Sequence, residues 1–176
     1  MHNKIIRAIN FASAAHKDQV RKGTGEPYII HPVRVFLIIQ ESGFMGYQLE
    51  TQIAALLHDV IEDTTYSKVD IHAHFGNDVA DLVQELTNVY EKSAYPDLNR
   101  KERKRLEFER IAGISQRAKL IKLADRIDNL TERGLNGGFM RKYLKESRDL
   151  LEVLRGTDEF LEERLDKLIS DGMMEE

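Results

Sequence analysis

The chain has 176 residues and a formal net charge of −4, with 41% hydrophobic and 32% charged residues. These values are typical of a globular protein with a sizeable core, so we expect residues 1–176 to form a single domain. The sequence contains no cysteine, which excludes disulfides, iron–sulfur clusters, cysteine-ligated zinc and thiol nucleophiles. The acidic balance argues against nucleic acid as a bulk partner.

No apolar run approaches the roughly 20 residues that a membrane-spanning helix needs. The N-terminal stretch, in which Lys4 and Arg7 precede apolar residues, could imitate a short secretory signal, but Asn10 and His16 interrupt it. We therefore expect an amphipathic first helix, no membrane partner and a cytoplasmic location.

The spacing of apolar residues indicates an all-α fold, because no segment shows sustained strand-like alternation. A first helix is predicted over residues 3–17, with His16 as a buried structural histidine. The glycines and the proline of residues 21–28 predict a loop. Pro32 is expected in the first turn of the next helix, which places His31 at its N-cap.

The most informative predicted helix covers residues 53–64, where apolar residues recur at helical spacing. Four ionisable residues lie among them: His58, Asp59, Glu62 and Asp63. Burying these groups without compensation would cost on the order of several kcal/mol, and a metal ion could provide the compensation. The alternative is a polar dipeptide near a helix end, with the imidazole bound to a backbone carbonyl.

The remaining chain predicts further helices separated by turns. They are expected over residues 67–75, through 79–86, from Ser115 onward, over 141–155 and over 157–170. Turns are predicted at residues 90–99 and 134–138. His72 and His74 are expected on the surface. The basic run at residues 100–105 indicates either a solvated helical face or a source of cations for a phosphate.

Four residues from three predicted helices are candidates for holding one metal ion: His31, His58, Asp59 and Asp125. Two neutral imidazoles and two carboxylates balance the charge of a divalent cation. This mixed set of nitrogen and oxygen donors suits Mn²⁺, Fe²⁺ or Zn²⁺ better than Ca²⁺. The order of these residues resembles the signature of the HD superfamily of metal-dependent phosphohydrolases, which implies a helical bundle with a metal site at its centre.

Longer stretches resemble one branch of that superfamily, the hydrolase domain of RelA/SpoT proteins. The similar segments lie between Phe11 and Asn129, and they are residues 21–32, 54–64, 75–76, 82–87 and 119–130. The stretch 102–106 and the chain length look most like the stand-alone small alarmone hydrolases, including the metazoan SpoT homologues.

This resemblance implies hydrolysis of guanosine tetraphosphate and pentaphosphate at the 3′ position, which releases pyrophosphate and GDP or GTP, usually with Mn²⁺. It makes the four candidate residues above the metal ligands. It also implies that Glu62 and Asp63 are the catalytic pair, which would orient a water molecule and manage its proton.

The resemblance further implies a set of substrate contacts. Arg21 and Lys22 match residues that flank the guanine base, and a planar guanidinium can stack on a purine. Asn129 matches a residue that contacts the nucleoside. Arg100, Lys104 and Tyr143 lie near positions that hold phosphates.

One residue departs from the family pattern. Asp128 stands where relatives often carry His or Tyr, and its negative charge is expected either to weaken binding of a polyanion or to pair with Arg126. The chain also stops before any synthetase region, so no opposing activity is expected.

Two other interpretations remain open. The same metal chemistry could act on another substrate, such as a simple nucleotide or the phosphate of NADPH. The chain could also be a non-catalytic nucleotide-binding module with an inactive metal site, although intact Glu62 and Asp63 argue against this. The sequence does not specify the oligomeric state.

Overall fold

The computed structural model describes residues 2–132 and 137–174, and within these ranges it contains helices and no strand. An isolated antiparallel bridge joins Val20 and Pro27 in the predicted loop. The prediction of an all-α fold is therefore confirmed. Over the same ranges, no helix combines the length and the apolar character needed to cross a membrane.

The N-terminal half forms one group of helices. In chain order they are α1 (His2–Ala15), α2 (Ile30–Gln40), the 3₁₀ helix η1 (Phe44–Tyr47), α3 (Leu49–Leu57), α4 (Val60–Asp63), α5 (Lys68–Phe75) and α6 (Asn77–Leu86). The C-terminal half consists of α7 (Arg100–Ala112), α8 (Gln116–Thr131), α9 (Gly137–Leu154) and α10 (Glu159–Met174).

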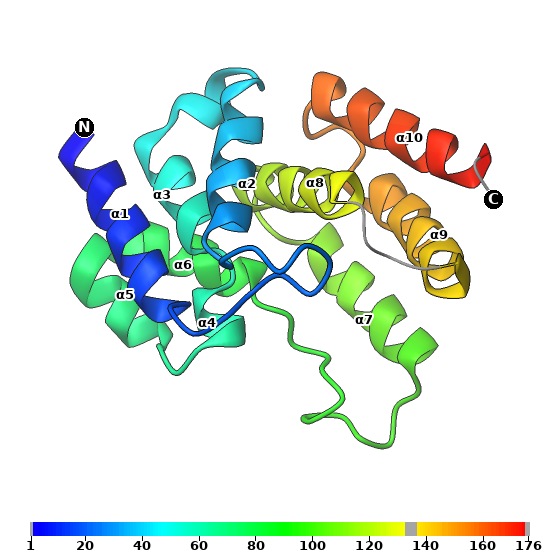
Figure 1. Ribbon diagram of the computed structural model, residues 1–176, viewed down its shortest axis with the longest axis horizontal. Coiled ribbons are helices and arrows are strands. Elements are labelled where there is room, and N and C mark those ends of the chain that lie inside the picture. Colours follow the sequence, from blue (N-terminus) through cyan, green and yellow to red (C-terminus); the bar gives the residue numbers. More distant parts are fainter. Residues whose placement is uncertain (1, 133–136, 175–176) are drawn as a thin grey trace.

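Helix α8 crosses the middle of the molecule (Figure 1). It contacts α2, α3 and α6 on one side and α9 and α10 on the other, so it joins the two groups of helices. Six of its apolar side chains are fully buried: Ala118, Leu120, Ile121, Leu123, Ala124 and Ile127. Because these side chains project in several directions around the helix axis, the helix has to lie inside the protein, which explains its central place.

Side-chain caps define where two helices begin. The Ser115 hydroxyl accepts the backbone N–H of Ala118 at 3.2 Å, as its residue type predicts for an N-cap. At the start of α7, Asn99 and Glu102 form a reciprocal capping box. These caps fix the register of the helices that carry Lys104 and Asp125.

The predicted helix over residues 53–64 is wrong in one respect, because the structure divides it into α3 and α4. The break falls at His58 and Asp59. The Nδ1–H of His58 donates to the carbonyl of Ala55 at 2.8 Å, and in a continuous helix that carbonyl would accept a backbone N–H. The imidazole therefore takes the carbonyl that a continuous helix would use, and the helix is interrupted at His58 and Asp59.

Two details at the N-terminal end also differ from the prediction. His31 lies inside the first turn of α2, because the N-cap is Ile29. Helix α1 ends at Ala15, before the predicted Lys17.

Two other expectations for this end of the chain are confirmed. Pro32 does lie in the first turn of α2. His16 is buried, and its Nδ1 lies 2.8 Å from Gln19 Oε1, which confirms its structural role.

Further along the chain, the predicted elements agree with the structure to within a few residues. His72 and His74 are exposed, as predicted. Of the turn predicted at residues 134–138, residues 134–136 lie outside the described part of the chain, and α9 already includes Gly137.

Leu120 offers a test of the central packing. Replacement of this fully buried side chain by alanine should lower the free energy of unfolding by about 2–5 kcal/mol, because it removes apolar contacts and leaves a cavity. Urea unfolding measures this change. Leu37, which is 54% exposed on α2, is the matched control, and its replacement by alanine should change stability by about 0.5 kcal/mol or less. Equal effects at the two positions would contradict the assignment of the core.

Candidate active site

Imidazole and carboxylate groups meet where α2, the α3–α4 break and α8 come together. His31 comes from α2, His58 and Asp59 come from the break, and Asp125 comes from α8. One potential ligand atom from each of His31, His58 and Asp125 lies within 4.8 Å of the others. The structure thus brings together three side chains that are far apart in the sequence.

Asp59 belongs to the same cluster. Its Oδ2 lies 3.0 Å from His58 Nε2 and 3.5 Å from His31 Nε2. Asp125 Oδ1 lies 3.2 Å from His31 Nε2 and 3.7 Å from His58 Nε2. Both carboxylates therefore face both imidazoles around one point.

The partners of the outer ring nitrogens define what the imidazoles present to that point. His31 Nδ1–H donates to Asp128 Oδ2 at 2.7 Å, and His58 Nδ1–H donates to the Ala55 carbonyl. A metal-binding imidazole is neutral and has one N–H, so in that state each Nε2 turns a lone pair toward the carboxylates, which can only accept. His58 Nε2 is buried and makes no hydrogen bond of acceptable geometry, although Asp59 is close. A divalent cation binds to the lone pairs of nitrogen and oxygen atoms. These two imidazole nitrogens and two carboxylates are therefore a suitable set of ligands for it.

The pKa values of the cluster express the same need for positive charge. Although burial lowers it, hydrogen bonds to Asp125 and Asp128 raise the pKa of His31 to about 11. Burial also lowers the pKa of His58, but the charge of Asp59 raises it to about 9. Burial favours the neutral form of Asp59, yet the charge of His58 holds its pKa well below the usual range. The carboxylates therefore stabilise any positive charge placed between them, and a bound cation can take the place of these protons.

Glu62 and Asp63 follow the cluster on α4. Glu62 Oε2 accepts the backbone N–H of Asn88 at 2.8 Å, and burial raises the pKa of Glu62 although Lys122 opposes the shift. Burial and then the charge of Asp59 raise the pKa of Asp63. A carboxyl group whose pKa moves toward neutrality can accept a proton and return it more readily.

Tyr28 connects Asp59 of the cluster with Asp63 of the acidic pair, a role that only its place in the loop hinted at from the sequence. Its hydroxyl lies 2.7 Å from Asp59 Oδ2 and 2.9 Å from Asp63 Oδ2. The single hydroxyl proton is therefore shared between a member of the cluster and a member of the acidic pair.

A cavity of about 270 Å³ opens beside the cluster, and charged side chains of both signs line it. Its acidic lining residues are Asp59, Glu62, Asp63, Glu107 and Asp125. Its basic lining residues are Arg21, Lys104, Lys122 and Arg126. Burial lowers the pKa of Lys104, and the neighbouring charge of Arg126 adds to that shift. This crowding of like charges favours an anion between them.

Arg126 is the most buried of these cations, with 9% of its surface exposed. Its guanidinium lies 4.5 Å from the centre of the Tyr143 ring, and its Nη1 donates to Ser147 Oγ at 3.2 Å. Its Nε is buried without a hydrogen-bond partner. The guanidinium can therefore donate further hydrogen bonds to a ligand in the cavity.

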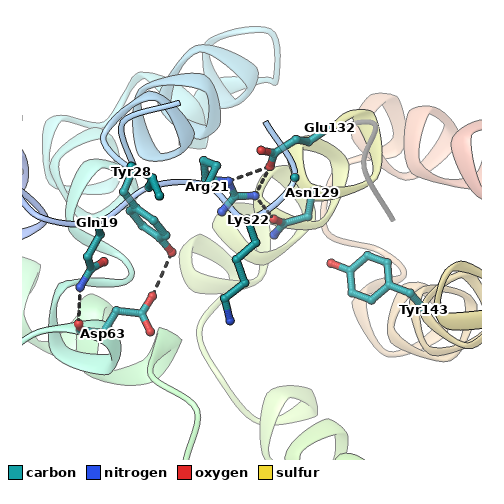
Figure 2. Close-up of a pocket in the computed structure, with 10 residues that line it drawn as sticks. Gln19, Arg21, Lys22, Tyr28, Asp63, Asn129, Glu132 and Tyr143 are labelled. Carbon is teal, nitrogen blue, oxygen red and sulfur yellow. Dashed lines mark hydrogen bonds and ion pairs between the residues drawn. The ribbon is translucent and has the colours of Figure 1, made fainter. Parts of the chain in front are cut away.

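A second pocket of about 530 Å³ adjoins this cavity, and several predicted substrate contacts line it (Figure 2). Arg21 donates from Nε to Glu132 Oε2 at 2.7 Å and from Nη2 to Asn129 Oδ1 at 2.6 Å. Asn129 Nδ2 in turn donates to Asp125 Oδ1 at 2.6 Å. Lys22 and Tyr143 line the same pocket, and Figure 2 shows the Tyr143 ring across from Asn129.

Arg100 is the predicted substrate contact that the structure does not bring to either pocket. It lies at the start of α7 and forms two hydrogen bonds of 2.8 Å with Glu146 of α9. Lys104, one turn later, does reach the cavity. Arg100 is therefore bound to Glu146 outside the cavity beside the cluster, and it lines a neighbouring pocket together with Lys22 and Lys104.

Three of the residues that line these pockets have no role assigned from the sequence: Lys122, Arg126 and Glu132. The four-residue spacing of Lys122 and Arg126 on an apolar helix was a usable signal, whereas nothing in the sequence marked Glu132. Of the two alternatives for Asp128, the pairing with Arg126 is wrong. Asp128 turns toward α2 and accepts from His31 and, at 2.7 Å, from Arg34 Nε.

Comparison with known proteins places this geometry in context. The chain is 39% identical over 174 residues to the guanosine-3′,5′-bis(diphosphate) 3′-pyrophosphohydrolase MESH1 of Xenopus tropicalis, with 95% of this chain and 93% of the relative covered. It is 36% identical over 172 residues to the protein of the same name from Homo sapiens, with 94% and 92% covered.

A solved structure is also similar to this chain. It is described as a metazoan ortholog of SpoT that hydrolyzes ppGpp and plays a role in starvation responses. The TM-score is 0.83 at 38% sequence identity, and the match covers 96% of this chain and 94% of that one. Residues 8–149 match the family model described as HD domain. The chain therefore belongs to the HD domain family.

Proposed function

We propose that this protein hydrolyses the 3′-pyrophosphate of guanosine tetraphosphate and pentaphosphate, with GDP or GTP and pyrophosphate as products. The observation that carries the proposal is the cavity beside the cluster, which is lined by both carboxylates and cations. Relatives whose names state this activity cover nearly the whole chain, which supports the same substrate class.

The proposal treats residues 1–176 as one hydrolase domain that acts on a small molecule. One contiguous cluster of buried apolar side chains, drawn from α1 to α10, supports this view. The cytoplasmic location expected from the sequence stays a prediction.

His31, His58, Asp59 and Asp125 are the proposed ligands of one divalent cation, which we take to be Mn²⁺. Two nitrogen and two oxygen donors suit Mn²⁺, and they also suit Fe²⁺ or Zn²⁺. When bound, such an ion acidifies a water molecule and withdraws charge from phosphoryl oxygens.

Glu62 and Asp63 are proposed to handle the proton of the attacking water. Hydrolysis adds water across the bond between the ribose 3′ oxygen and phosphorus, so one proton must leave the water and one must reach the 3′ oxygen. Raised pKa values suit both carboxyl groups for this exchange. Tyr28 holds Asp63 by its hydroxyl, which limits the directions that this carboxylate can take.

Three of the cavity's cations, Lys104, Lys122 and Arg126, are proposed to hold the phosphoryl oxygens. Negative charge develops on the pyrophosphate product, and fixed cations stabilise such charge without reorganisation. In the adjoining pocket, the anchored guanidinium of Arg21 offers a flat surface for the base.

Product analysis tests the proposed substrate. The purified protein with Mn²⁺ should convert guanosine tetraphosphate to GDP and pyrophosphate, which ion-exchange chromatography separates. Parallel reactions with NADPH and with simple nucleotides test the other interpretations. Turnover confined to NADPH would overturn the proposed substrate, and a filled metal site without any turnover would favour a binding module.

Asp59→Ala should lose both the metal and the activity, because one ligand and one balancing charge disappear. Metal content after gel filtration in Mn²⁺ and turnover of guanosine tetraphosphate measure the two losses. Asp81→Ala, at an exposed position on α6, is the control and should keep both. Turnover by the Asp59 variant with manganese still bound would refute the ligand assignment.

Glu62→Gln should keep the metal but slow turnover by roughly a hundredfold or more, the usual size of a general acid–base contribution. The amide oxygen can still accept the N–H of Asn88, so the fold around it is expected to persist. Turnover at saturating substrate is compared with that of Glu109→Gln, which changes an exposed glutamate of α7. An unchanged rate in the Glu62 variant would remove this residue from the mechanism.

A further inference from the structure

Asp128 is a buried carboxylate, 2% exposed, whose two oxygens have different partners. Oδ2 accepts from His31 Nδ1 and Oδ1 accepts from Arg34 Nε, both at 2.7 Å. We propose that Asp128, itself held by Arg34, is a positioning residue that orients His31 and strengthens its Nε2 as a ligand for a divalent cation. The inference rests on the proposed metal site and is independent of the nucleotide.

The orientation of His31 follows from what a carboxylate can do. An ionised carboxylate accepts hydrogen bonds and donates none, so the imidazole proton is held on Nδ1. The lone pair of Nε2 is then directed at the point that Asp59 Oδ2 and Asp125 Oδ1 also face, at 3.5 and 3.2 Å from this nitrogen. Rotation of the ring would break the bond to Asp128.

The two imidazoles of the cluster differ in the acceptor behind them. His58 donates to the neutral carbonyl of Ala55, whereas His31 donates to a charged group. A negative acceptor pulls more strongly on the Nδ1 proton and leaves more electron density on Nε2. Asp128 therefore makes His31 the stronger of the two nitrogen donors.

Arg34 offsets the free-energy cost of burying the charge of Asp128. Asp128 adds negative charge close to Asp59 and Asp125, and an unpaired buried charge of this kind would be costly. Arg34 lies three residues after His31 on α2, and its side chain is 32% exposed. Its Nη1 also donates to Glu26 of the loop at 3.2 Å, which fixes the far end of the guanidinium.

Asp128 also joins α8 to α2, so a purely structural role is the competing explanation. A clamp between helices would contribute to the free energy of unfolding but would not change the affinity for a cation once the protein is folded. Metal affinity and stability, measured separately on the same variants, distinguish the two roles.

The experiment titrates the metal-free full chain with Mn²⁺ in competition with a chelating indicator. Asp128→Asn keeps the size of the side chain but removes its charge, and it should raise the Kd for Mn²⁺ about 10–100-fold. Asp78→Asn is the matched control, because Asp78 of α6 forms an ion pair with Arg117 of α8 away from the cluster. The Kd of this control variant for Mn²⁺ should equal that of the wild type.

Arg34→Gln provides the second variant, since this partly exposed side chain can be replaced even if Asp128→Asn fails to fold. Its Kd should rise about threefold or more, because the carboxylate loses its anchor. Wild-type affinity in whichever of these two variants folds, together with lowered stability in urea, would overturn the proposal in favour of a clamp.

Absence of Mn²⁺ binding to the wild type would overturn the metal site and this inference together. Metal binding without hydrolysis of guanosine tetraphosphate would contradict the proposed substrate alone, and the affinity difference would still support the role of Asp128.

Discussion

Two imidazoles and two carboxylates converge inside this protein, and the two carboxylates require positive charge between them. Negative groups of this kind repel one another unless such charge is present. The fold orients these side chains by unrelated means: a backbone carbonyl behind His58, a carboxylate behind His31, and an asparagine on Asp125. Positive charge, as protons on the imidazoles or as a bound cation, then lies between the carboxylates.

The cavity beside the cluster contains groups for a cation and groups for an anion. Its carboxylates can bind a cation and manage a proton, while its basic side chains can bind an anion, so a metal and a phosphate are accommodated together. Arg126 shows the free-energy cost of this arrangement, because its buried Nε lacks a hydrogen-bond partner. An unsatisfied group of this kind inside a folded protein is characteristic of a place that a ligand completes.

The sequence was a good guide to this site wherever residue type and spacing determine the outcome. The helical periodicity predicted the fold, and the order of the histidines and aspartates indicated which side chains would meet. Periodicity could not predict the break at His58, because the break depends on an imidazole that competes for one carbonyl. The hydrogen bonds that hold Arg100 outside the cavity are made to Glu146, which lies far away in the sequence. The same holds for Asp128, whose partners Arg34 and His31 belong to another helix.

The origin of the cluster in separate helices has a thermodynamic consequence. No short segment of the chain contains a complete set of ligands, so an unfolded chain cannot hold a cation in the same way. Binding to the native state alone stabilises it by mass action, by about 2.7 kcal/mol when the free ion is at a hundred times its dissociation constant. The melting temperature of this protein is then a property of the solution as much as of the chain, and it follows the supply of metal.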